Sequence, residues 1–244
     1  MSTLAVGIEQ NPPAKPHAWQ TQLWARALRR AGRRWVMSRH VARFCDPFTV
    51  EAGEHLRDLR GPVIIMPNHS SHMDTPVALS MLPERIRSRT YVGAAADRFY
   101  RPGKRTWWFS LFYGAFPIHR GGGSAALDYA KKLLAGGASI MLYPEGTRSQ
   151  NGEMARFHHG VSLLATQAGV PVVPIYMEGL RDVMPKGQRE PRPAAVHVRI
   201  GAPVRLDGLA VPEGTARLED AMRALIPVDV AQPPSAVQSE LVAA

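Results

Sequence analysis

The sequence has a single cysteine, Cys45, among its 244 residues. One cysteine excludes an intrachain disulfide framework and any zinc or iron–sulfur site built from several cysteines. Long apolar runs are also missing: the longest, residues 107–116, has about half of the roughly 18 residues that a membrane-spanning helix needs. The first 15 residues lack the basic start and continuous apolar stretch of a secretory signal. We therefore expect a cytoplasmic protein, although not one that is necessarily free in solution.

Acidic residues are absent between residues 10 and 45, and the basic residues gather there. One lysine and seven arginines in this segment carry +8 of the formal net charge of +10, so the rest of the chain is nearly balanced. A strongly basic segment indicates an anionic partner, such as nucleic acid, acidic protein or anionic lipid. The balanced remainder gives no support to a nucleic-acid partner. The basic residues are Lys15, Arg26, Arg29, Arg30, Arg33, Arg34, Arg39 and Arg43.

Residues 17–44 have the pattern of a basic amphipathic helix. Apolar residues recur every three to five positions and form one stripe, with the arginines mainly off it. Tryptophan beside arginine is typical of a helix at a membrane interface. We therefore expect a peripheral protein on the anionic inner face of the cell membrane. The alternatives are a helix that packs on its own domain with a solvated arginine face, and a nucleic-acid contact. The stripe consists of Trp19, Leu23, Trp24, Leu28, Ala31 and Trp35.

Beyond this helix, short apolar runs alternate with helical patterns. Such alternation is typical of an α/β fold, and we expect a single domain with a mixed, largely parallel sheet flanked by helices. The expected organisation is a flexible N-terminus over 1–16, the membrane-association helix over 17–45, the α/β domain over 46–226 and a disordered tail over 227–244. The expected strands are 63–67, 90–94, 114–119, 139–143, 170–176 and 195–200, and the expected helices are 75–82, 124–135, 159–168 and 215–225.

The first candidate site is Asn-His-Ser-Ser-His-Met-Asp at residues 68–74, directly after an expected strand. Ligands of α/β proteins bind at the carboxyl ends of strands. His69 is suited to take a proton near neutral pH, and a carboxylate such as Asp74 on its other ring nitrogen would fix its tautomer. The two meet only if His69 precedes the helix and Asp74 lies in its first turn. His72 is an alternative base. In a third interpretation, Ser70 or Asp74 caps the helix and both histidines merely pack.

The second candidate is Tyr-Pro-Glu-Gly-Thr-Arg-Ser at residues 143–149, again directly after an expected strand. Gly146 lets a ligand approach the backbone closely, and Arg148 supplies a planar fork for a phosphate. Glu145 could pair with Arg148 or with a substrate group. The alternative is a surface turn with a weak exposed ion pair.

The third candidate, residues 114–120, ends at Arg120 and is followed by three glycines, which together indicate a phosphate-binding nest. It is not a P-loop, because no Gly-Lys-Ser/Thr follows. The alternative is a flexible turn that ends at a helix N-cap, Ser124.

A fourth segment, Val-Pro-Val-Val-Pro-Ile at residues 170–175, has the composition of a core strand. Proline has no N–H to donate, so the two prolines disfavour a central, fully paired position in the sheet.

Taken together, these four segments resemble the PlsC-type glycerolipid acyltransferases, the 1-acylglycerol-3-phosphate O-acyltransferase family. The family's Asn-His-x-x-x-x-Asp, arginine-terminated, Pro-Glu-Gly-Thr-Arg and Val-Pro-Val-x-Pro blocks occur here in the family order, within residues 60–201. The resemblance implies a glycerol-3-phosphate acyltransferase-like fold for residues 46–226. It also implies transfer of a fatty acyl group from acyl-CoA or acyl-carrier protein to the hydroxyl of a lysophospholipid. The acceptor that the family name indicates is 1-acylglycerol-3-phosphate, and the product is then phosphatidic acid.

The resemblance also implies a role for each matching residue. His69 is the general base and Asp74 orients it, and no metal or redox cofactor is required. The matching residues of the second and third blocks bind the glycerol phosphate of the acceptor, and the matching proline of the fourth block is linked to substrate binding. These residues are Arg120, Glu145, Gly146, Thr147, Arg148 and Pro174.

The chain departs from the family pattern at three places. The second block usually reads Phe-Ile-Asp-Arg, and residues 117–120 read Pro-Ile-His-Arg. Residues 94–97 read Ala-Ala-Ala-Asp where many members have a lysine, and residues 157–160 read Phe-His-His-Gly in place of Phe-Lys-x-Gly. A different lysolipid or lipid hydroxyl therefore stays an alternative acceptor. One remaining alternative is a metal-dependent hydrolase that uses His69, His72 and Asp74 together with His119 or the pair His158 and His159. The other is a noncatalytic membrane-binding module.

Overall fold

The structure is a computed structural model that describes residues 15–100, 104–119, 127–149, 152–185, 187–188 and 190–227. Within these residues the strands form a seven-stranded sheet in the order β1-β7-β6-β2-β5-β3-β4. Neighbouring strands are parallel, except for the antiparallel pair β6 and β7. The predicted mixed, largely parallel sheet is therefore confirmed. The strands are β1 (Cys45–Glu51), β2 (Ile64–Pro67), β3 (Thr90–Ala95), β4 (Ala115–Ile118), β5 (Ser139–Met141), β6 (Val172–Glu178) and β7 (Ala194–Ile200).

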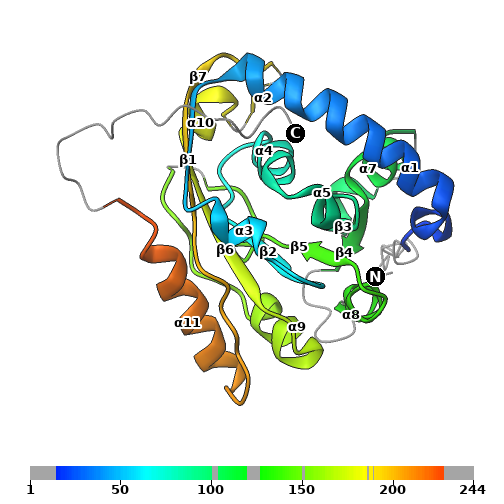
Figure 1. Cartoon of the computed structure of the whole chain (residues 1–244), viewed down its shortest axis with the longest axis vertical. Coiled ribbons are helices and arrows are strands. Elements are labelled where there is room, and N and C mark those ends of the chain that lie inside the picture. Colours follow the sequence, from blue (N-terminus) through cyan, green and yellow to red (C-terminus); the bar gives the residue numbers. More distant parts are fainter. Residues whose placement is uncertain are drawn as a thin grey trace, which may run out of the picture.

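Helices flank the sheet, as the sequence predicts (Figure 1). The four helices expected in the α/β part correspond to α4, α8, α9 and α11, although residues 124–126, expected to begin α8, lie outside the described residues. Residues 1–14 and 228–244, most of the expected flexible N-terminus and tail, also lie outside them. The helices are η1 (Ala18–Thr21), α1 (Leu23–Gly32), η2 (Arg33–Met37), α2 (Ser38–Phe44), α3 (Glu54–Arg57), α4 (Asp74–Met81), α5 (Glu84–Arg87), α6 (Ala96–Phe99), α7 (Lys104–Tyr113), α8 (Asp128–Ala135), α9 (Gly160–Ala168), α10 (Leu180–Val183) and α11 (Val211–Arg223).

Successive residues of the central strands enter two apolar cores on opposite faces of the sheet. In β2, Ile64 packs in the core with Leu133 of α8 and Leu164 of α9, whereas Ile65 packs in the core with Val77 of α4 and Met37 of η2. A strand that is buried on both faces has a continuous apolar sequence, because its side chains alternate between the faces. The loop after β2 therefore starts from a rigid, fully buried strand.

Strand β1 is not predicted from the sequence, because its apolar residues do not alternate regularly and Pro47 interrupts them. It lies at the edge of the sheet and pairs in parallel with β7, with a shift of register between Cys45 and Phe48. Edge strands tolerate proline and bulges, since one side of the strand has no partner.

Strand β6 lies inside the sheet, between β2 and β7, although it contains Pro174. The expectation that its prolines disfavour a central position is therefore wrong. Antiparallel pairing with β7 starts only at Ile175 and Ile200. The carbonyl of Pro174 accepts a hydrogen bond from the N–H of Gly201 (2.9 Å), just beyond β7. The proline falls where the ladder to β7 ends, so its missing N–H breaks no bond of that ladder.

The N-terminal helix, formed by α1, η2 and α2, packs on the domain through a row of residues four positions apart. These are Ala25, Arg29, Arg33, Met37 and Val41, and all five are buried. The sequence places arginines on a solvated or lipid-facing side of this helix, and for Arg29 and Arg33 that expectation is wrong.

Both buried guanidinium groups bind backbone carbonyls instead. Carbonyls at a helix C-terminus lack partners within the helix and interact favourably with a cation, so the end of α7 is a natural binding site for an arginine. Burial lowers the pKa of both side chains. The acceptors are the carbonyls of Arg87, Thr90, Phe112 and Tyr113 for Arg33, and those of Gln20 and Leu111 for Arg29.

The outward side of the same helix carries large exposed apolar side chains. Leu23 is 80% exposed and Trp35 is 66% exposed. Helix α7 lies beside α1, and the ring of Trp107 is 5.4 Å from that of Trp19, between centroids. No described helix is long and apolar enough to cross a membrane. The N-terminal helix thus packs on its domain and still leaves its apolar stripe open. We call Leu23, Trp24, Leu28, Trp35, Trp107 and Trp108 the tryptophan face.

Candidate active site

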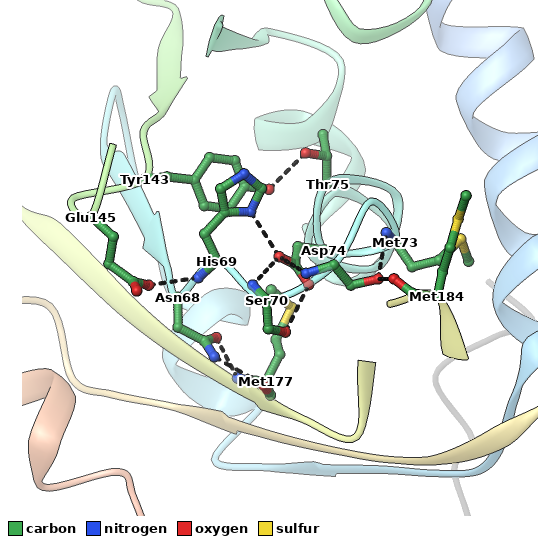
Figure 2. Close-up of polar contacts among 11 residues, drawn as sticks. Asn68, His69, Ser70, Met73, Asp74, Thr75, Tyr143, Glu145, Met177 and Met184 are labelled. Carbon is green, nitrogen blue, oxygen red and sulfur yellow. Dashed lines mark hydrogen bonds and ion pairs between the residues drawn. The ribbon is translucent and has the colours of Figure 1, made fainter. Parts of the chain in front are cut away.

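His69 and Asp74 form a hydrogen-bonded pair directly after β2 (Figure 2). The Nδ1 atom of His69 lies 2.8 Å from Oδ2 of Asp74. His69 precedes α4 and Asp74 is the first residue of that helix, which is the arrangement that the spacing of the two residues requires. Asp74 is completely buried, whereas the His69 side chain is 21% exposed. The carboxylate therefore fixes the tautomer of a ring that ligands can reach.

Backbone amides hold the carboxylate of Asp74 in place. Its Oδ2 accepts hydrogen bonds from the N–H groups of Ser70 (2.6 Å) and Ser71 (2.8 Å). Asn68 anchors the same loop to β6, because its side-chain amide both donates to the carbonyl of Met177 (3.0 Å) and accepts from the N–H of Met177 (2.8 Å). A carboxylate is stabilised at a helix N-terminus by the dipole and by such amides. The carboxylate of Asp74 thus orders the loop before α4 and meets the ring of His69, but it makes no capping hydrogen bond to the helix itself.

Glu145 touches the same loop from the end of β5. Its Oε1 accepts a hydrogen bond from the backbone N–H of His69 (2.7 Å), and its Oε2 accepts one from the N–H of Ala155 (3.0 Å). The residue is only 2% exposed. Burial raises the pKa of Glu145, and the two N–H donors partly oppose this shift. Its carboxylate therefore links the backbone of His69 to the loop around residue 155.

Tyr143 lies against the imidazole of His69. The two rings are stacked, with centroids 4.0 Å apart and planes 24° apart. The phenol oxygen of Tyr143 lies 2.6 Å from Oγ1 of Thr75, the residue after Asp74. Burial raises the pKa of Tyr143 well above its ordinary value, and the nearby charge of Asp74 adds to the shift. The phenol is therefore neutral. Figure 2 shows Tyr143 and Asp74 on different sides of the His69 ring.

A cavity of about 780 Å³ opens at this pair and brings together segments far apart in the chain. His69 and Tyr143 form part of its wall, beside the loop that carries Gly146, Thr147 and Arg148. His72 also lines the cavity, but it is His69 whose ring meets Asp74. The far wall is more apolar and comes from the N-terminal helix and α7, through Val36, Met37, Phe109, Phe112 and Tyr113.

The remaining predicted site residues are placed differently. Pro174 is buried in β6, opposite Met66 of β2. Arg120 lies outside the described residues. Sequence reasoning missed Tyr143 and Thr75, and the signal available for Tyr143 was its position in the motif, one residue before Pro144. Among the described residues, no group of three or more histidine, cysteine, aspartate or glutamate side chains could hold a metal ion, so the hydrolase alternative gains no support from them.

Comparison with known proteins agrees with the fold and the family resemblance. The family model described as Acyltransferase matches residues 47–178. The 1-acyl-sn-glycerol-3-phosphate acyltransferase alpha of Mus musculus is 30% identical over 170 residues, covering 66% of this chain and 56% of that protein. The chloroplastic acyltransferase LPAT1 of Arabidopsis thaliana is 32% identical over 142 residues, covering 57% of this chain and 38% of that protein. This chain spans about half the length of the first of these relatives.

A solved structure supports the architecture. The crystal structure of the 1-acyl-sn-glycerophosphate (LPA) acyltransferase PlsC from Thermotoga maritima is similar with a TM-score of 0.62 at 23% sequence identity, covering 82% of this chain and 78% of that one. With the matching family model, the ordered motif blocks and the pair of His69 and Asp74, the chain belongs to the acyltransferase family.

Proposed function

We propose that this protein transfers a fatty acyl group from a thioester donor, acyl-CoA or acyl-carrier protein, to the hydroxyl of 1-acylglycerol-3-phosphate, which gives phosphatidic acid. The observation that carries the proposal is the pair of His69 and buried Asp74 at the wall of the cavity. The names of the relatives, which act on this acceptor, support the choice of substrate.

In the proposed reaction His69 acts as general base. Because Nδ1 is bound to Asp74, Nε2 is the ring nitrogen left for the acceptor hydroxyl. As Nε2 takes the proton, the hydroxyl oxygen attacks the thioester carbonyl and a carbon–oxygen bond forms. The carbon–sulfur bond then breaks, and the imidazolium returns the proton to the departing thiolate. General-base catalysis of this kind contributes roughly 10²–10⁴-fold.

Arg148 and the backbone around Gly146 are the groups proposed to hold the acceptor phosphate, together with Thr147 and with Arg120, which lies outside the described residues. An arginine binds phosphate through two parallel N–H donors. The roles of Glu145 and Pro174 in substrate binding stay predictions: both carboxylate oxygens of Glu145 accept backbone N–H groups, and Pro174 is buried in β6.

The test is a panel of lysolipids, phosphate-free acceptors included, offered with acyl-CoA or acyl-carrier protein and followed by mass spectrometry of the products. We expect phosphatidic acid from 1-acylglycerol-3-phosphate, and a loss of about 10²-fold or more in the His69→Ala variant. His72→Ala serves as the matched control and should keep most of the activity. Product from another acceptor alone would replace the proposed substrate, and full activity of His69→Ala would remove the proposed base.

We also propose that the tryptophan face docks on an anionic membrane surface, with exposed arginines such as Arg34 and Arg39 beside it. Exposed tryptophans insert at headgroup depth, and each basic residue near an anionic leaflet contributes about 1 kcal/mol. Vesicle flotation tests this. Arg34→Ala/Arg39→Ala should bind anionic vesicles more weakly than the matched pair Arg217→Ala/Arg223→Ala on α11, which packs on the other face of the sheet. Equal binding by the two double variants would contradict the proposal.

A further inference from the structure

Besides the N–H of Ser149, which binds the backbone carbonyl of His69, three contacts hold this residue, and each meets a different part of it. Asp74 binds Nδ1 of the ring, Glu145 binds the backbone N–H, and Tyr143 covers one face of the ring. We propose that Tyr143 is a positioning residue for the base: it fixes the plane of the imidazole and stabilises the imidazolium that forms when His69 takes the proton. This inference rests on the proposed function, since it assigns a role within that reaction.

The geometry of the stack gives the first argument. A single hydrogen bond at Nδ1 holds one atom of the ring but, within the tolerance of that bond, still allows the ring to tilt by rotation about Cβ–Cγ. A flat neighbour with its centroid 4.0 Å away and its plane 24° off blocks that tilt on one side. Together, the bond to Asp74 and the stack on Tyr143 define where Nε2 lies. A misplacement of about 1 Å can cost 10²-fold in rate, so the definition of this plane bears on catalysis.

The anchoring of Tyr143 gives the second argument. Its phenol oxygen is bound at 2.6 Å to Thr75, which follows Asp74 in the first turn of α4. One helical turn therefore holds both groups that fix the imidazole, the carboxylate directly and the phenol ring through Thr75. The bond to Thr75 thus ties the phenol ring to the helical turn that carries Asp74.

The charge of the ring gives the third argument. Burial and the neighbouring Asp74 raise the pKa of Tyr143 well above its ordinary value, so the stacked partner is a neutral phenol. A cation over a neutral aromatic face is stabilised by the electron density of that face. The neutral imidazole gains less from it than the imidazolium, and the stack therefore favours the protonated state that the reaction creates.

Kinetics of Tyr143 variants test the inference with the full chain, acyl donor and lysolipid acceptor. Tyr143→Phe keeps the ring and loses only the bond to Thr75, so we expect kcat to fall about threefold, whereas the matched control Tyr176→Phe on β6 should keep the wild-type kcat. Tyr143→Leu loses the ring, and we expect kcat to fall about tenfold or more while the acceptor KM changes much less.

The pH profile separates positioning from a purely structural role. Loss of the aromatic face should move the acid limb of kcat/KM to lower pH by about half a unit in Tyr143→Leu but not in Tyr143→Phe. The variants leave in place the other titratable or charged groups that face His69 or share its cavity. These are Asp74, Glu145, His40, His72, Tyr113 and Arg148.

Each outcome decides the matter. A Tyr143→Leu variant with wild-type kcat, with an unshifted acid limb, or with a raised KM as its only defect would overturn the inference. If the leucine variant does not fold, Tyr143→Met gives a second side chain without a ring, and the same results are expected of it. Failure of the proposed function looks different: the wild type itself would then transfer no acyl group, or His69→Ala would be as active as the wild type.

Discussion

The guanidinium of Arg33 donates a hydrogen bond to the backbone carbonyl of Tyr113, the last residue of α7, at 2.7 Å. Arg33 belongs to the N-terminal helix, and the strands β1, β2 and β3 lie between it and Tyr113 in the chain. Tyr113 lines the cavity together with His69. The contact therefore joins the helix that carries the tryptophan face to the apolar wall of the proposed active site.

Replacement of Arg33 should destabilise the fold strongly. Arg33→Met keeps much of the volume but leaves four backbone carbonyls, one in a buried and three in partly buried contacts, without this donor. An unsatisfied buried polar group costs about 1–3 kcal/mol, so we expect the free energy of unfolding to fall by at least about 3 kcal/mol. Urea unfolding monitored by tryptophan fluorescence measures it. Arg34→Met, at the exposed neighbouring position, should change stability by no more than about 0.5 kcal/mol. Equal effects at the two positions would show that the buried contacts contribute little.

Loss of the Asp74 carboxylate should slow catalysis without weakening acceptor binding. Asp74→Asn has nearly the same shape, and its carbonyl oxygen can take the place of Oδ2 and accept the N–H groups of Ser70 and Ser71, but the ring of His69 loses the negative charge beside Nδ1. We expect kcat to fall by about 10²–10⁴-fold with a small change in acceptor KM. Steady-state kinetics at saturating acyl donor measures both constants. A variant that retains most of its kcat would show that the pair is structural.

The sequence predicts the contact between His69 and Asp74 better than it predicts the surroundings of that contact. The spacing of His69 and Asp74, with the strand before them and the helix after them, is local information, and the structure has the arrangement that this spacing requires. The contacts of Tyr143 and Glu145 with His69 join residues about 75 positions apart, and no periodicity encodes which loops meet at the edge of a sheet.

The same distinction between local and long-range information explains where the fold differs from the predictions made from the sequence. Proline has a low propensity for central strands, which predicts that Pro174 does not lie in one. Tertiary packing places β7 beside β6 all the same, so the context of the strand outweighs the propensity of the residue. The helical pattern of residues 17–44 agrees with the helix over residues 23–44, which a separate turn over residues 18–21 precedes, but the pattern predicts outward-facing arginines. A buried arginine needs several carbonyls from distant segments to converge on it, and those acceptors are backbone groups that leave no signature in the sequence.

Glu145→Gln distinguishes a positioning role for Glu145 from the acceptor-binding role that the family resemblance implies. Glutamine keeps one carbonyl oxygen, but its amide nitrogen would face an N–H donor, either that of His69 or that of Ala155. If Glu145 positions the base, kcat falls about tenfold or more and acceptor KM stays close to the wild-type value. If it binds the acceptor, KM rises instead. Initial rates over a range of acceptor concentrations separate the two.

Glu145 should also make stability depend on pH. Because burial raises its pKa in the folded state, the folded protein binds the proton more tightly than the unfolded chain does. The associated stability is fully present below the unfolded value of about 4.3 and is lost as pH rises through the raised folded value. The free energy of unfolding of the wild type, minus that of Glu145→Gln, should therefore decrease across this window. Urea titrations at a series of pH values measure the difference, and a difference that increases with pH would contradict the burial of the charged carboxylate.

Gly146 should be intolerant of a side chain for two separable reasons. Its φ of +65° lies in the left-handed region, and an added Cβ would lie 3.0 Å from Cδ2 of His158. Gly137 has a similar φ of +77° but open space around it, so Gly137→Ala carries the backbone strain alone, about 1–2 kcal/mol. We expect Gly146→Ala to lose similar stability and, in addition, to raise the acceptor KM several-fold, because the loop that carries Arg148 must shift. A double-mutant cycle with His158→Ala measures the coupling between the two side chains. Recovery of KM in the double variant assigns the defect to the contact with His158, whereas additive effects would show that backbone strain alone displaces the loop.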